Sequence, residues 1–152
     1  MRRLAYIVVL TLLLPLMGCT PRDSLDQIME SGRLTVVSRN SPTTWYIDKN
    51  GPAGFEHALA SRFAQRLGVE LQVTPAFSLE DIFLQLDRND ADLAAAGLAL
   101  TGERESQYPH SVSYYTLRPQ VVYLAGSPRP RTPRDLLDRT IVVLEGSRHS
   151  RY

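Results

Sequence analysis

The sequence predicts an α/β fold with a parallel-type sheet flanked by helices. Three observations indicate it: short apolar stretches alternate with longer amphipathic ones, glycines follow two of the amphipathic stretches, and a Ser-Leu-Glu-Asp sequence opens a third. A chain that alternates strand and helix at this spacing forms right-handed βαβ units, and their strands lie parallel in one sheet. The length of 152 residues suits one domain.

The first eighteen residues have the pattern of a secretion signal. Met1-Arg2-Arg3 is basic, and residues 4–17 are almost continuously apolar. A membrane-spanning helix needs about 20 apolar residues, so this stretch is too short to span a bilayer. We therefore predict a signal peptide over residues 1–18.

The single cysteine, Cys19, directly follows that stretch in the order Leu16-Met17-Gly18-Cys19. A lone cysteine in an exported protein forms no internal disulfide, which leaves a small buried side chain, a free thiol or a modified residue. The four residues resemble the bacterial lipobox, and this resemblance implies lipidation of Cys19. Thr20 stands where inner-membrane lipoproteins carry an acidic residue, which favours the periplasmic face of the outer membrane. Residues 19–24 would form the tether to that membrane.

The charge balance excludes one class of partner. The chain has 17 basic and 16 acidic residues, and removing residues 1–18 takes away two arginines and no acid, which leaves a net charge of −1. Nucleic-acid binding needs a clustered basic face, so no nucleic acid is expected. The sequence has no P-loop or dinucleotide-binding fingerprint, so we expect no cofactor. We also expect no metal, because the three histidines lack the spacing of metal ligands: His57, His110 and His149.

The elements ahead of residue 68 are predicted from periodicity and turn residues. A helix over residues 23–31 places Leu25, Ile28 and Met29 on one face, and a strand over residues 33–38 follows. Residues 39–52 are polar and turn-rich, with a tight turn at Asn50-Gly51. The clearest helix spans residues 55–67. Its apolar face consists of residues at a spacing of three or four: Phe55, Leu59, Ala60, Phe63, Ala64 and Leu67.

The later elements continue the alternation. A strand is predicted over residues 70–76, followed by a helix that opens with a capping box at Ser78 and runs to Leu86. A buried strand over residues 93–96 precedes a loop with a short helix capped by Thr101. Three further segments complete the prediction: strands over residues 119–123 and 140–144, and a helix start at Thr132-Pro133 between them.

Two groups of motifs resemble family 3 of the bacterial extracellular solute-binding proteins. The first group is Gly54-Phe55-Glu56 with Leu59-Ala60 and Leu67-Gly68, and the second comprises residues 92–97, 101–104 and 113–115. The resemblance covers residues 25–147 and implies a periplasmic binding protein type II-like fold. The expected parts are one nearly complete lobe over residues 25–123, a crossover at residues 124–131 and the truncated start of a second lobe at residues 132–152.

Other residues are similar to the binding half of membrane-bound lytic transglycosylases. They are residues 39–44, 51–56, 118–120 and 126–130. Members of that group join the binding domain to a lysozyme-like domain that cleaves peptidoglycan and leaves a 1,6-anhydro sugar. This chain contains none of that second domain, so no catalytic residue is expected in it. The resemblance implies a ligand-sensing regulatory module, with an amino-acid-binding lipoprotein of an ABC transporter and a receptor sensor domain as alternatives.

The candidate ligand-binding residues follow a predicted buried strand. The resemblance implies that Arg104 binds a ligand carboxylate, which a planar guanidinium can hold through two parallel hydrogen bonds. Gly97 and Thr101 follow the carboxyl end of a parallel strand, where open α/β sheets bind ligands. The alternatives are an exposed arginine and a glycine required only by a turn.

Aromatic and turn residues add secondary candidates. Trp45 and Tyr46 suit a wall of the binding cleft or the protein core equally well. Glu56 is expected to stabilise a helix N-terminus rather than act as an acid, and Gly146-Ser147 is a candidate anion-binding turn. Ala99 stands where amino-acid-binding relatives often have a polar residue, so the ligand is either amino-acid-like or a peptidoglycan fragment.

Overall fold

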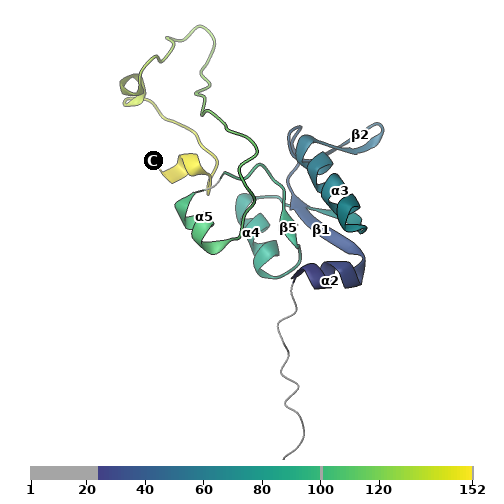
Figure 1. Cartoon of the computed structure of the whole chain (residues 1–152). Helices are drawn as coiled ribbons and strands as arrows, with labels where there is room; N and C mark the ends of the chain where they lie inside the picture. The colour runs from purple at the N-terminus through teal and green to yellow at the C-terminus, as the bar shows by residue number, and fades with distance from the viewer. Residues whose placement is uncertain (1–23, 100, 152) are drawn as a thin grey trace, which may run out of the picture.

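A computed structural model describes residues 24–99 and 101–151 of the chain (Figure 1). The helices α2 to α5 and the strands form one body, and a long segment leaves it after α5 and returns to end beside that helix. The predicted signal peptide and Cys19 lie outside the described residues. In the described ranges, no helix is long and apolar enough to cross a membrane.

A three-stranded parallel sheet forms the centre of the body. β1 (Arg33–Ser38) lies between β4 (Glu70–Pro75) and β5 (Leu93–Ala94), and Val36 of β1 is opposite both Val73 and Leu93. β1 follows its predicted bounds, whereas β5 is two residues shorter than predicted. This arrangement confirms the predicted α/β class with parallel strands.

Helices cover both faces of the sheet, because the side chains of β1 alternate between them. On one face, Val37 packs with Leu79 and Ile82 of α4 (Leu79–Asp87). On the other face, Leu34 and Val36 belong to a second cluster. Its helical members come from α2 (Ser24–Ser31) and α3 (Phe55–Leu67), and they are Ile28, Ala60 and Ala64.

The buried face of α3 is only part of the predicted apolar face. Ala60 and Ala64 are buried as predicted, whereas Phe55, Leu59 and Phe63 are each about half-exposed. Small alanine side chains let the helix backbone lie close to the sheet. α2 shows a similar difference, since Ile28 is buried but its predicted companions are about half-exposed: Leu25 and Met29.

The ends of α3 and α4 follow from local chemistry. Gly68 ends α3 in the left-handed conformation, with its N–H bonded to carbonyls of the last turn. Ser78 accepts a hydrogen bond of 3.0 Å from the backbone N–H of Asp81, and the Asp81 carboxylate accepts one from the N–H of Phe77. The predicted helix start at Ser78 is therefore confirmed.

A short hairpin replaces the predicted turn-rich loop. β2 (Tyr46–Asp48) pairs antiparallel with β3 (Gly51–Ala53), and Asp48 is opposite Gly51. The two turn residues are Lys49 and Asn50, one position earlier than the predicted Asn50-Gly51. The Asn50 N–H donates to the Asp48 side chain at 2.6 Å, which closes the turn at this position.

The predicted strands over residues 119–123 and 140–144 are wrong. Both segments lack regular structure, and Val122 and Val142 are 94% and 91% exposed. In the described part of the chain neither segment has a strand beside it to bond its backbone groups. The remaining helices are short: α5 (Gly102–Gln107) and the 3-10 turns η1 (Pro133–Leu136) and η2 (Arg148–Arg151).

Candidate ligand-binding site

The carboxyl ends of β1 and β5 meet at one edge of the sheet and bring Arg39, Thr44 and Gly97 together. A Cβ atom placed on Gly97 would lie 3.4 Å from Cγ2 of Thr44 and 3.5 Å from a terminal nitrogen of Arg39. Gly97 has a φ of 64°, a conformation that favours glycine. The predicted residue Gly97 therefore lies at the expected edge. The sequence argument missed Arg39, although it directly follows the central strand.

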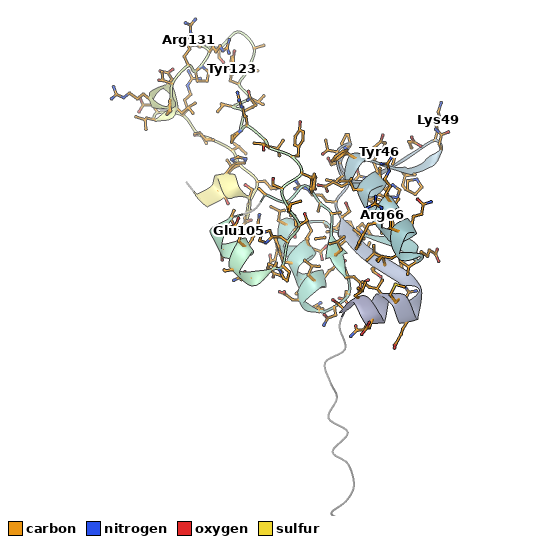
Figure 2. All side chains as sticks on the ribbon, in the orientation of Figure 1. Tyr46, Lys49, Arg66, Glu105, Tyr123 and Arg131 are labelled. Atoms are coloured by element: carbon orange, nitrogen blue, oxygen red, sulfur yellow. The ribbon has the colours of Figure 1, made fainter. Side chains whose placement is uncertain are left out.

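A compact loop holds Arg39 and Thr44 at this edge. The Thr44 hydroxyl donates to the Arg39 carbonyl at 2.5 Å, and the Ser41 N–H donates to the Trp45 carbonyl at 3.0 Å. Trp45 is half-buried, and its Nε1 is buried without a hydrogen-bond partner among the described residues. Tyr46 is also half-buried and begins β2 at the base of the hairpin (Figure 2).

Gly54 allows this loop to approach the start of α3. A Cβ atom on Gly54 would lie 2.2 Å from the Thr44 carbonyl oxygen, and the φ of Gly54 is 125°. The same carbonyl accepts a hydrogen bond of 3.0 Å from the N–H of His57 in the first turn of α3. The loop thus takes the place of a side-chain cap, which α3 lacks.

Glu56 joins three segments through one buried carboxylate. Only 5% of its surface is exposed, and it lies in the first turn of α3, as expected. Oε2 accepts a hydrogen bond of 2.8 Å from the N–H of Gly97, and Oε1 accepts one of 2.5 Å from the hydroxyl of Tyr114. Partial burial raises the pKa of Tyr114 well above its usual value, and the Glu56 carboxylate raises it further. Glu56 therefore holds the Gly97 turn in place.

Arg104 belongs to α5, and its guanidinium reaches Phe83 of α4. Its guanidinium donates to the carbonyl of Ala99 at 3.2 Å and to that of Gly146 at 2.8 Å. Its central carbon lies 4.9 Å from the centre of the Phe83 ring, at cation–π distance. The Thr101 hydroxyl caps α5 by accepting from the Arg104 N–H at 3.5 Å. Arg104 is thus positioned by both helices and by the turn at Gly146.

Arg104 lines a cavity of about 350 Å³ between α4 and α5. In this cavity Tyr108 donates to the Asp87 carboxylate at 2.9 Å, and burial together with that carboxylate raises the pKa of Tyr108. Gly97 and Thr101 are not among the residues that line this cavity, although Thr101 contacts the backbone of Arg104 as the cap of α5. The lining combines apolar, acidic and donor groups: Leu79, Glu80, Phe83, Leu84, Asp87, Glu103, Arg104, Gln107, Tyr108 and Gly146.

The donor groups of the described ranges do not form a metal centre. No group of three or more His, Cys, Asp or Glu side chains in residues 24–99 and 101–151 is placed to hold a metal ion.

A parallel sheet with helices on both faces, polar groups at its carboxyl edge and an arginine-lined cavity are typical of a ligand-binding α/β domain. Residues 33–148 match the bacterial extracellular solute-binding proteins, family 3, and the chain belongs to that family. It is also 43% identical over 147 residues to a membrane-bound lytic murein transglycosylase F of Pseudomonas syringae pv. tomato. That match covers 95% of this chain and 30% of the relative, so the chain spans less than a third of the relative's length.

Solved structures with a similar fold bear amino-acid-binding names. An ancestral cationic amino acid solute-binding protein superposes with a TM-score of 0.51 at 32% identity, over 55% of this chain and 37% of that one. A mutant of the arginine-bound form of domain 1 from TmArgBP gives a TM-score of 0.50 at 31% identity, over 54% of this chain and 64% of that one. These likenesses confirm the predicted periplasmic binding protein-like class.

Proposed function

We propose that this chain is a binding module for a small anionic, amino-acid-like ligand, and that Arg104 is its main charged contact. The observation that carries the proposal is the guanidinium of Arg104, which two carbonyls and the Phe83 ring hold at a cavity of about 350 Å³. A guanidinium has five N–H donors, and these contacts use two of them. The remaining donors can bind a carboxylate in a forked geometry.

The turn at Gly146 provides a second group for the same ligand. Arg104 contacts the Gly146 carbonyl directly, and the Ser147 hydroxyl is buried without a hydrogen-bond partner among the described residues. A buried hydroxyl without a partner is unfavourable, and a ligand acceptor would satisfy it. Thr101 would support the site as the cap of α5. Gly97, Trp45 and Tyr46 do not line this cavity, so they would contact the ligand only where it extends toward the carboxyl edge of the sheet.

The similar structures support an amino-acid-like ligand, and one of them is a single domain described as arginine-bound. A ligand held by one domain makes this chain suitable for direct binding measurements. The cavity of this chain has three acidic side chains beside Arg104, so a ligand with both an amino group and a carboxylate suits it: Glu80, Asp87 and Glu103.

The likeness to transglycosylase F supports a further part of the proposal. In a longer parent protein, this module would sense peptidoglycan fragments and regulate a lytic domain that cleaves the MurNAc-GlcNAc bond to 1,6-anhydro products. The chain itself would not catalyse. Lipid on Cys19 would hold the protein on the periplasmic face of the outer membrane, as two or three acyl chains suffice for stable anchoring.

A second candidate function is an amino-acid-binding lipoprotein of an ABC transporter. The amino-acid-binding names of the similar structures favour it. The gene sequence beyond residue 152 distinguishes the two. A second lobe followed by a lysozyme-like domain supports the transglycosylase proposal, and a stop codon after the second lobe supports the transporter proposal.

Calorimetry on the full chain, purified in detergent, tests the role of Arg104 with free amino acids and peptidoglycan stem peptides as probes. Arg104→Ala removes a charge-assisted contact to the ligand, so we expect it to weaken ligand binding by about 10- to 150-fold. Arg104→Lys restores only part, because ammonium keeps the charge but lacks the fork. Arg66→Ala, on the exposed side of α3, is the matched control. Unchanged affinity in an Arg104→Ala variant that melts like the parent contradicts the proposal.

Fatty-acid labelling tests the proposed anchor. Expressed with its signal in a Gram-negative host, the chain is expected to incorporate a fatty-acid probe and to partition into detergent. Cys19→Ser removes the only thiol of the chain and should abolish both results. Persistent labelling and membrane association of that variant would refute lipidation at Cys19.

A further inference from the structure

The two helices that cover one face of the sheet expose large apolar side chains. Ile28 of α2 packs with Ala60 and Ala64 of α3, so both helices lie on the same face. Beside these buried contacts, the two helices carry five large apolar residues that are 42–53% exposed: Leu25, Met29, Phe55, Leu59 and Phe63. We call these five residues the α2–α3 surface. A single exposed apolar residue is ordinary, whereas a group of them on one face marks a docking surface.

Arginines border the apolar part of α3. Its three exposed apolar residues are four positions apart and form a stripe along the helix. Arg62 and Arg66 are both exposed, and each follows a member of the stripe by three residues, so they lie beside it. The one acid of α3, Glu56, is buried, so the charges on the exposed side of this helix are positive. Aromatic and leucine side chains bordered by arginines are typical of helices that lie on a membrane interface.

The position of Cys19 favours a membrane as the partner of the α2–α3 surface. Four residues, 20–23, separate Cys19 from Ser24 at the start of α2. An extended chain spans at most about 3.6 Å per residue, so a lipid on Cys19 would hold the start of α2 within about 18 Å of the membrane. Two exposed acids of α2, Asp26 and Glu30, oppose attraction to anionic lipids. The arginines of α3 favour that attraction, so we assign the docking mainly to α3.

We infer that the α2–α3 surface docks on an anionic lipid bilayer, the membrane that holds the lipid of Cys19. The apolar stripe of α3 enters the boundary between headgroups and acyl chains, and Arg62 and Arg66 bind lipid phosphates. α4 lies on the opposite face of the sheet, so the cavity between α4 and α5 faces away from the membrane and stays open to a ligand. This inference rests on the proposed lipid anchor and adds the orientation of the body on the membrane.

Fluorescence quenching by lipids with brominated acyl chains tests this orientation. The full lipidated chain is reconstituted in vesicles of phosphatidylglycerol and phosphatidylcholine, with Trp45→Phe to remove its single tryptophan. Leu59→Trp or Leu84→Trp then introduces one reporter. The two leucines are matched, since they are 42% and 41% exposed on helices that cover opposite faces of the sheet. An apolar helix face enters the interface by about 5–10 Å, so the bromines should quench Leu59→Trp strongly and leave Leu84→Trp nearly unchanged.

Arg62→Glu combined with Arg66→Glu tests the contribution of charge in the Leu59→Trp chain. One arginine near an anionic surface strengthens binding by about fivefold, so the double variant should weaken docking by about 25-fold or more and lose most of the quenching. Arg129→Glu combined with Arg131→Glu is the matched control. It makes the same change of charge on the segment that extends away from the body (Figure 2), and it should leave the quenching unchanged.

Flotation with the vesicles separates this inference from the proposed anchor. A chain that floats but shows equal quenching at the two reporter positions, or none, overturns the docking surface and leaves the anchor standing. Quenching of Leu59→Trp that survives Arg62→Glu with Arg66→Glu overturns the docking on anionic lipid. A blue shift of Leu59→Trp in detergent that grows with chain concentration assigns the surface to a second copy of the chain, which also overturns the inference. A chain that does not float contradicts the proposed anchor itself.

Discussion

Residues 24–99 and residues 109–151 both contain paired valines, yet only the first region buries them. Val36 and Val37 of β1 are almost completely inaccessible, whereas Val142 is 91% exposed and Val143 is 41% exposed. β1 has a strand on each side and helices on both faces. The second segment has no such neighbours in the described residues. Strand propensity alone therefore does not make a strand, because the backbone and side chains both need a partner.

The two regions also differ in how their local structure is stabilised. In residues 24–99, hydrogen bonds join distant parts of the chain, such as the bond between Glu56 and Gly97. In the second region, Asp135 accepts from the nearby N–H groups of Arg131 and Thr132 at 2.7 and 2.9 Å, and these bonds lower the pKa of its carboxyl. Figure 2 shows Tyr123 and Arg131 on the segment that extends away from the body.

The largest expected effect is that of Gly54→Ala. The new Cβ would meet the Thr44 carbonyl oxygen at 2.2 Å, and alanine would be strained at a φ of 125°. Overpacking and backbone strain together should lower the free energy of unfolding by about 2–6 kcal/mol. Gly126→Ala is the control in the second region, since it also has a positive φ but open space around it. Similar urea midpoints for the two variants would contradict the predicted close approach.

A smaller loss is expected from Ile82→Ala. Ile82 is fully buried in α4, and its truncation leaves a cavity that should lower the free energy of unfolding by about 2–5 kcal/mol. Val142→Ala shortens an exposed side chain and should change the free energy of unfolding by less than about 0.5 kcal/mol. Urea unfolding followed by circular dichroism measures both. A comparable loss in Val142→Ala would show that residues 140–144 are packed.

The smallest effect is expected at the contact that joins the two regions. Tyr114→Phe removes one hydrogen bond to Glu56, and the half-exposed position of Tyr114 limits the loss to about 1 kcal/mol at neutral pH. The raised pKa of Tyr114 also predicts a pH dependence, because the neutral phenol is favoured in the folded state. The stability that Tyr114 contributes is fully present below about pH 10, which is the pKa of a tyrosine in the unfolded chain. It is lost as the pH rises toward the higher pKa of Tyr114 in the folded state.

Thermal melts between pH 8 and 11 measure this pH dependence of the stability, since that range includes the ordinary tyrosine pKa of about 10. The parent chain should lose stability at the alkaline end more steeply than Tyr114→Phe. Tyr115→Phe is the control, since Tyr115 is exposed and lies next in the sequence. An identical alkaline slope in the parent and Tyr114→Phe would mean that the contact with Glu56 does not form in solution.

Local sequence signals were sufficient for much of the body. β1 and α3 follow their predicted bounds, and Ser78 starts α4 as predicted, because a capping side chain and a terminal glycine act on their own neighbours. The family was also predicted, from motifs within residues 54–115. The candidate site was predicted only in part: Gly97 lies at the expected edge of the sheet, while its neighbours Arg39 and Thr44 were missed.

The sequence by itself determined the family, the caps of α3 and α4, and the alternation of β1, α3, β4, α4 and β5, since these depend on residues close together in the chain. It did not predict the β2–β3 hairpin, and it predicted two strands after residue 118 that the structure lacks. Only the tertiary structure decided which residues of the predicted apolar face of α3 are buried, because the alanines pack closer to the sheet than Phe55 and Phe63. It also decided that Arg39 adjoins Gly97 while Arg104 lines a separate cavity. These proximities arise where parallel strands end side by side and where helices pack, and sequence separation does not encode them.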